Sequence, residues 1–154
     1  RTLWDRAQIA EGLRLVEDAL RVHGRPDTYA VQAAIAALHA RAPDYESTDW
    51  RQIAGLYEVL LRINPSPVVE LNHAVAVAMV DGPARALDLI DALAARGTLR
   101  GYEPLYAVRA DLLRRLERRA EACDAYRAAI AATQLEPSHR FYARRIAELE
   151  DESG

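Results

Sequence analysis

Few side chains in this sequence could hold a metal ion or act as nucleophiles. The four histidines, His23, His39, His73 and His139, are scattered without the spacing of metal ligands. The single cysteine, Cys123, lies beside alanine in a helical pattern, which favours a small packed residue over a nucleophile. The glycines occur singly, so no glycine-rich phosphate loop is present. We therefore expect no catalytic residue, no metal and no cofactor, and we expect that the protein is not an enzyme.

Arginine forms the basic concentrations, and all 20 positively charged side chains are arginine because the sequence has no lysine. Glutamates lie between these arginines, which favours a solvated helical face with ion pairs over a nucleic-acid surface. The formal net charge of −3 points the same way. The acidic tail from Glu148 to Glu152 is interpreted as a solubilising, frayed end. The concentrations are Arg114, Arg115, Arg118 and Arg119, then Arg140, Arg144 and Arg145.

The composition, with 51% hydrophobic and 28% charged residues, is ordinary for a soluble domain, and the exclusive use of arginine suggests GC-rich, bacterial coding. One cysteine fits a reducing cytosol. No apolar stretch approaches the roughly 18 residues of a membrane span, and no signal peptide is visible. Because the sequence opens on Arg1, we expect an excised C-terminal part of a longer protein.

Helical spacing of apolar residues predicts an all-α fold without strands. Prolines are expected in the first turn of four of the helices, where the missing N–H costs nothing. The expected helices run from about 2 to 22, from 27 or 28 to before 43, from 50 to 61, from 67 to 80, from 83 to 95, from 104 to 116, from 118 or 119 past 129, and from 137 to 150.

Three helical stretches share one pattern. A large residue lies four positions after the first residue of the pattern, and an apolar residue lies three positions after the large one. The first and second stretches are 33 residues apart, and the second and third are 36 apart. A period near 34 with an alanine and a large residue four positions on is typical of tetratricopeptide repeats. The stretches are Ile53–Tyr57–Leu60, Ala86–Ile90–Leu93 and Ala122–Tyr126–Ala129.

The repeat predicts a right-handed, tetratricopeptide-like α-solenoid of about eight helices in antiparallel pairs. We expect a single domain over 1–154, with a helix pair at 1–42, a repeat core at 48–136 and a capping helix at 137–150. Glu117 departs from the pattern because glycine is usual at that turn. The alternative is an irregular helical bundle with accidental spacing.

In such an array the first helix of each pair lines a concave groove, so its polar residues are the candidates for contact with a partner. Asn72 and Arg109 stand in otherwise apolar stretches, and they either bond to neighbouring groups or face a ligand. A lysine-based clamp for peptide carboxylates is disfavoured because lysine is absent. The candidate residues are Gln32, His39, Asn72, His73, Arg109 and Asp111.

Four segments carry a resemblance to a known family: RTLWDRAQIAEGL (1–13), YAVQAAIAALHARAP (29–43), the stretch from DWRQIAGLYEVLLRINPSPVVELN to ARALDLID (49–91), and YAVRADLLRRLERRAEACDAYRAAI (106–130). They resemble the C-terminal tetratricopeptide extension of bacterial extracytoplasmic-function sigma factors. His73 departs from the family, in which arginine is expected.

The resemblance implies a regulatory, protein-binding domain of a transcription initiation factor. Its partners would be its own N-terminal sigma domains, RNA polymerase or a regulatory protein. Promoter DNA would be contacted only through sigma regions upstream of Arg1, and no membrane would be involved. Two alternatives stay open: a free-standing peptide-binding adaptor, and a small-molecule sensor with a ligand near Asn72 and Arg109.

Overall fold

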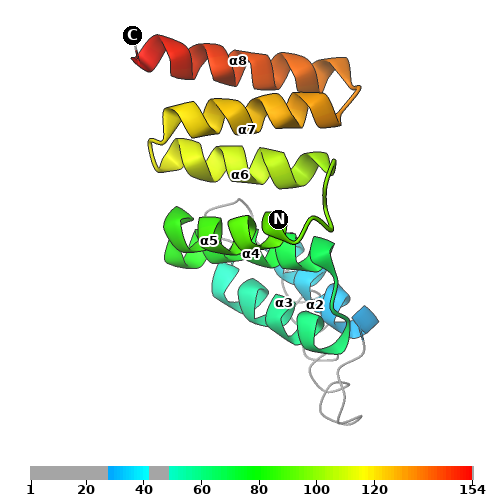
Figure 1. The fold of residues 1–154 in the computed structure, drawn as a ribbon. Coiled ribbons are helices and arrows are strands. Elements are labelled where there is room, and N and C mark those ends of the chain that lie inside the picture. The colour runs from blue at the N-terminus through cyan, green and yellow to red at the C-terminus, as the bar shows by residue number, and fades with distance from the viewer. Residues whose placement is uncertain (1–27, 42–48, 154) are drawn as a thin grey trace. The chain divides into compact units, whose positions relative to one another are not determined.

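The computed structural model describes residues 28–41 and 49–153, and within these ranges the protein is helical without a strand (Figure 1). The all-α prediction is confirmed. The helix expected from about 2 to 22 lies outside the described residues. The described helices are α2 (Thr28–Arg41), α3 (Trp50–Ile63), α4 (Pro67–Asp81), α5 (Pro83–Ala95), α6 (Glu103–Arg115), α7 (Arg119–Ala132) and α8 (Glu136–Ser153).

Short-range chemistry sets the helix starts. The Asp49 side chain accepts a hydrogen bond of 3.2 Å from the amide of Gln52 and so caps α3. The Ser66 hydroxyl accepts from the amide of Val69 at 3.5 Å ahead of α4. Gly82, with φ of 94°, separates α4 from α5. The four prolines expected in first turns occupy the first position of α4 and α5 and the second position of α6 and α8.

Two compact units make up the chain, one from residue 1 to 76 and one from 77 to 154, with the division inside α4. Each unit is described by itself. The expected organisation as one domain, subdivided at 1–42, 48–136 and 137–150, stays a prediction.

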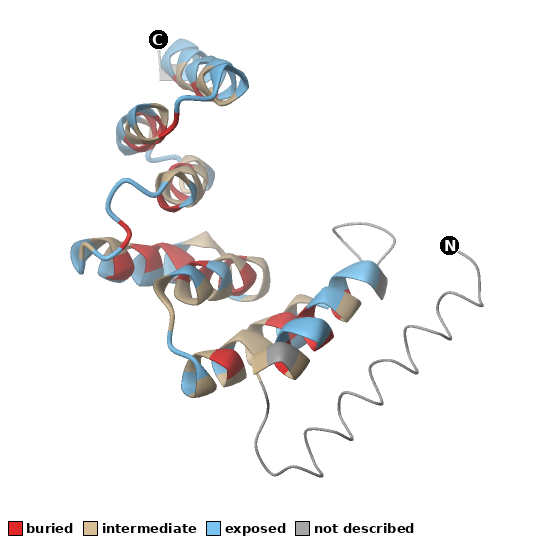
Figure 2. Ribbon diagram, turned by 90° about the vertical axis from the view of Figure 1, so that its right-hand side faces the viewer, coloured by how far each residue is buried: buried red, intermediate tan, exposed pale blue. Residues whose placement is uncertain are grey.

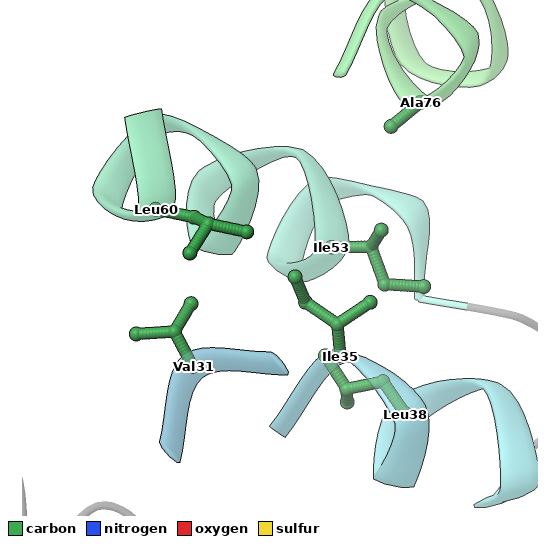
Figure 3. Close-up of a cluster of buried hydrophobic side chains, with 6 residues drawn as sticks. All are labelled: Val31, Ile35, Leu38, Ile53, Leu60 and Ala76. Atoms are coloured by element: carbon green, nitrogen blue, oxygen red, sulfur yellow. The ribbon is translucent and has the colours of Figure 1, made fainter. Parts of the chain in front are cut away.

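In the first unit, α2 packs against α3 around a small apolar core (Figure 3). Figure 3 shows the side chains of the two helices pointing toward one another, with Ala76 of α4 above α3. The spacing of the buried residues along each helix is the amphipathic spacing read from the sequence. The buried members of this core are Val31, Ile35, Leu38, Ile53, Leu60 and Ala76.

In the second unit, α5 packs against α6, α6 against α7 and α7 against α8. Figure 1 shows α6, α7 and α8 running antiparallel, one beside the next. Figure 2 shows their buried residues on the sides that face neighbouring helices. Each of α5, α6 and α7 therefore packs on the helix that follows it along the chain.

The repeat positions are core positions. Tyr57 is half-buried, and each of the other eight residues is at most 4% exposed. The alanine at the first repeat position, Ala86 in α5 and Ala122 in α7, is fully buried, so its small side chain permits close packing there. The eight are Ile53, Leu60, Ala86, Ile90, Leu93, Ala122, Tyr126 and Ala129.

The turn between α6 and α7 is built on a left-handed residue that is not glycine. Glu117 has φ of 61°, and the repeat usually has glycine at this position. Its amide donates to the carbonyl of Arg114 at 3.0 Å, and the amide of Arg118 donates to the carbonyl of Leu113 at 2.9 Å. These two bonds form a Schellman cap at the end of α6.

The acidic tail is part of helix α8. Helix α8 continues to Ser153, three residues beyond its expected end. Glu150 accepts a hydrogen bond of 2.9 Å from Arg127 of α7, and Glu152 lies 3.5 Å from Arg119. Helix α8 is therefore longer than the sequence predicts, and its acidic end pairs with the neighbouring helix. The solubilising, frayed character of the tail stays a prediction.

Candidate functional site

Gln32 and His39, the first two predicted groove residues, lie on α2 and are exposed. The His39 ring packs edge-on against Trp50 at the start of α3, with ring centroids 5.4 Å apart and planes at 77°. His39 therefore contributes to the packing of α2 on α3 as well as to the surface.

Asn72 and His73 are adjacent on α4 but differ in burial. Asn72 is exposed, so water satisfies its amide. His73 has a side chain only 16% exposed, and its Nε2 lies 3.6 Å from Glu58 Oε1, too far for a hydrogen bond. This buried Nε2 has no hydrogen-bond partner among the described residues. The arginine that the family resemblance predicts here would have the reach and the charge to pair with Glu58.

Arg109 and Asp111 lie on α6, and both are engaged by their own neighbours. Arg109 Nε donates to Asp91 Oδ1 of α5 at 2.8 Å. Asp111 accepts from Arg114 Nη2 at 2.6 Å and lies 3.0 Å from Arg115 Nε. The question raised by Arg109 in an apolar stretch is thus answered by a partner on the preceding helix.

Within the part of the chain that the structure describes, none of the six predicted residues forms a hydrogen bond or ion pair with another of the six. Four belong to the first unit, and Arg109 and Asp111 belong to the second. Residues two apart on a helix do not face each other, so Arg109 and Asp111 point in different directions. The six residues stay candidates for contact with a partner.

A polar network that the sequence analysis missed joins α6, α7 and α8. The Tyr142 hydroxyl of α8 donates to Glu103 Oε1 of α6 at 2.6 Å. The Tyr142 ring lies 5.9 Å from that of Tyr126 on α7. Burial raises the pKa of Tyr126, and Arg114 of α6 lowers it by a smaller amount. Burial, and then the bond to Glu103, raises the pKa of Tyr142 far above its usual value.

This network positions helices. The repeat pattern identified Tyr126 as a core residue, but Tyr142 lies outside the repeated positions and Glu103 is 39 residues from it in sequence. A pairing at that separation depends on helix register, which local sequence patterns do not report.

The predicted ion pairs of the arginine-rich segments are present. Arg118 and Glu121 make two hydrogen bonds, of 3.0 and 2.7 Å, and Arg145 lies 3.4 Å from Glu148. A hollow of about 160 Å³ lies at this end of α6, α7 and α8. Its basic and acidic side chains are equal in number, so it offers no excess of positive charge to an anion. The lining residues are Arg114, Glu117, Arg119, Arg145, Glu148, Leu149 and Glu152.

Cys123 lines a second, more open hollow of about 340 Å³ between α7 and α8. Its side chain is only 6% exposed. Burial raises the pKa of its thiol, so the thiolate that would act as a nucleophile is disfavoured near neutral pH. Its environment matches the predicted small packed residue.

Two searches were made of the described residues for other kinds of site. Within 28–41 and 49–153, no three histidine, cysteine, aspartate or glutamate side chains gather in a way that could bind a metal ion. None of the described helices combines the length and the apolar character needed to cross a bilayer.

Comparison with known proteins gives one informative similarity. The chain is 49% identical over 131 residues to an uncharacterized protein of Rhizobium meliloti (strain 1021). The match covers 85% of this chain but only 30% of the relative, so the chain spans less than a third of the relative's length. No family model and no solved structure matches the chain.

Proposed function

We propose that this chain is the C-terminal regulatory domain of an extracytoplasmic-function sigma factor and modulates transcription initiation by binding protein. In this proposal α2–α3, α4–α5 and α6–α7 are tetratricopeptide-like pairs of a right-handed solenoid, followed by α8. The domain binds its own sigma regions, RNA polymerase or a regulatory protein in the bacterial cytoplasm.

The observation that carries the proposal is the burial of the repeated residues together with the family resemblance. Eight of the nine repeat positions are at most 4% exposed, and they fall on α3, α5 and α7, which are every second helix. Equivalent positions buried at a period near 34 are what a repeat array requires. The specific segments quoted above, and not the repeat itself, point to sigma factors.

The relative's length agrees with such an arrangement. Its matched segment is 30% of a longer bacterial protein, which leaves room for further domains in that protein. A regulatory domain acts by binding two states of the initiation machinery with different affinity, because equal affinity shifts no equilibrium.

Run-off transcription with the parent sigma factor tests the proposal. The parent protein is compared intact and truncated before Arg1, with and without the 154-residue chain added in trans. If truncation abolishes transcripts and the added chain restores them, the domain activates. If truncation raises transcripts, the domain inhibits. Unchanged transcript yield would refute regulation and favour a free-standing peptide-binding adaptor.

A point variant of the intact parent tests the same proposal without relying on a truncated protein that could misfold. Asn72 is exposed on α4, one of the proposed groove helices, so Asn72→Arg in the intact parent should change the transcript yield at least about threefold. Ala131→Arg is the matched control because Ala131 is exposed on α7, away from the proposed groove. Equal effects of the two variants would place the binding surface elsewhere.

A further inference from the structure

Helix α8 has an outer face on which no helix of the second unit packs among the described residues. We define this face by its exposed residues, which lie at helical spacing opposite the buried Tyr142 and Leu149. Inward, α8 packs on α7 alone and reaches α6 through Tyr142. Figure 2 shows the far side of α8 as exposed. The outer face consists of Arg140, Ala143, Arg144, Ala147, Glu148 and Asp151.

Charge divides the outer face into two halves. Arg140 and Arg144, in the first half, have no ion-pair partner among the described residues, and neither has Asp151 in the second half. Glu148 has only a contact of 3.4 Å with Arg145. One half therefore presents basic groups and the other acidic groups, and most of these groups lack a partner.

Two small side chains lie among the charged residues of the outer face. Ala143 and Ala147 are four residues apart and exposed on the same stripe of the helix. Alanines at such a position let two helix backbones approach to about 8 Å, the short end of the usual interaxial distance.

We propose that the outer face of α8 binds the same face of a second copy of this chain, with the two helices antiparallel about a twofold axis. The axis passes between residues 145 and 146. It sets Arg140 opposite Asp151 of the partner subunit, and Arg144 within one residue of Glu148 of the partner subunit. One residue is about 1.5 Å along a helix, well within the reach of an arginine side chain. Such an interface is isologous, so each ion pair occurs twice.

A second copy fits this face better than an acidic peptide or a nucleic acid does. Either of those ligands would be attracted to Arg140 and Arg144 but repelled by Glu148 and Asp151. Only a ligand with the opposite polarity along its length satisfies both halves, and α8 itself in antiparallel orientation has that polarity. Phe141, 47% exposed with Arg145 5.3 Å from its ring centroid, lies beside the face and would be partly covered.

Sedimentation velocity of the 154-residue chain from 10 µM to 1 mM in 50 mM NaCl tests the proposal. We expect a dimer with a dissociation constant on the order of 100 µM, because one helix face is a small interface. Raising the salt to 500 mM should weaken it several-fold, since exposed ion pairs are screened. A monomer at 1 mM in low salt would overturn the proposal.

Charge reversal gives the decisive comparison. Arg140→Glu with Arg144→Glu, and separately Glu148→Arg with Asp151→Arg, should each raise the dissociation constant at least tenfold. An equimolar mixture of the two variants should associate again as a heterodimer, because each facing pair then has opposite charges, as in the wild-type dimer. Failure of the mixture to associate would refute the antiparallel pairing even if each variant alone were monomeric.

The matched control is Arg51→Glu with Arg100→Glu, which makes the same change of net charge at exposed positions on α3 and ahead of α6. It should leave the dimer unchanged, and a tenfold loss in this control would show that net charge and not the outer face governs association. Circular dichroism establishes that each variant is folded. Self-association does not depend on the proposed sigma-factor role, so either proposal can fail without the other.

Discussion

Glu117 occupies a backbone conformation that suits glycine, so Glu117→Gly should stabilise the protein. The residue has φ of 61° in the Schellman cap that ends α6. A left-handed conformation costs an L-residue roughly 1–2 kcal/mol, whereas glycine adopts it freely. Glycine also has more conformational freedom to lose on folding, which offsets roughly 0.5–1 kcal/mol. The expected net gain in the free energy of unfolding is about 0.5–1 kcal/mol.

The control for this change is Glu117→Ala, because alanine also removes the carboxylate but keeps a Cβ. A carboxylate near the C-terminus of a helix is slightly unfavourable, so both variants lose that term equally. The difference between the glycine and alanine variants therefore isolates the backbone conformation. It corresponds to roughly 1–4 °C in melting temperature for a chain of this size.

Urea unfolding is the assay, followed by circular dichroism and by tryptophan fluorescence. Both tryptophans, Trp4 and Trp50, lie within residues 1–76, so fluorescence reports on the first unit and circular dichroism on both units. If the two signals separate, only the transition of the second unit should move in the glycine variant. A glycine variant no more stable than the alanine variant would refute the assignment of strain to this turn.

Three further changes test the packing. Ile90→Ala, at a fully buried repeat position, should lower the free energy of unfolding by about 2–5 kcal/mol in urea titration, whereas Leu89→Ala, 39% exposed, should cost less than about 1 kcal/mol. Tyr142→Phe removes the bond to Glu103 and should cost about 0.5–1.5 kcal/mol at neutral pH. The pKa of Tyr142 is higher in the folded than in the unfolded state. The contribution of its hydroxyl to stability is therefore complete below about pH 10 and is lost as the pH rises further. The difference in the free energy of unfolding between the wild type and Tyr142→Phe should accordingly become smaller above that pH. Arg109→Ala removes a partly exposed ion pair between α5 and α6 and should cost at most about 1 kcal/mol, and a larger loss would show that this pair has a structural role.

Local chemistry explains why so many helix boundaries could be predicted. Gly82 and Pro83 determine where α5 begins. The helix expected from 83 to 95 has the same bounds in the structure. The repeat also marks a turn at Glu117, where glycine is usual, and the left-handed conformation of that residue is known only from the structure. These features depend on residues a few positions apart.

The polar contacts between helices could not be predicted in the same way. Asp91 pairs with Arg109 and Glu103 with Tyr142 through the rotation and register of packed helices. No period in the sequence reports those two quantities. The same reason explains the acidic tail: its pairing with Arg119 and Arg127 depends on where α8 lies along α7, so a segment that reads as a frayed end is helical.

The pairing of the acidic tail has a consequence for the order in which the second unit opens. Helix α7 buries Ala122, Tyr126 and Ala129, whereas the last turns of α8 rest on Leu149 and on exposed ion pairs with α7. Exposed ion pairs weaken in salt and apolar packing does not. The amides at the end of α8 should therefore exchange with solvent first, and earlier still in concentrated salt, while those of α7 open only with the whole unit.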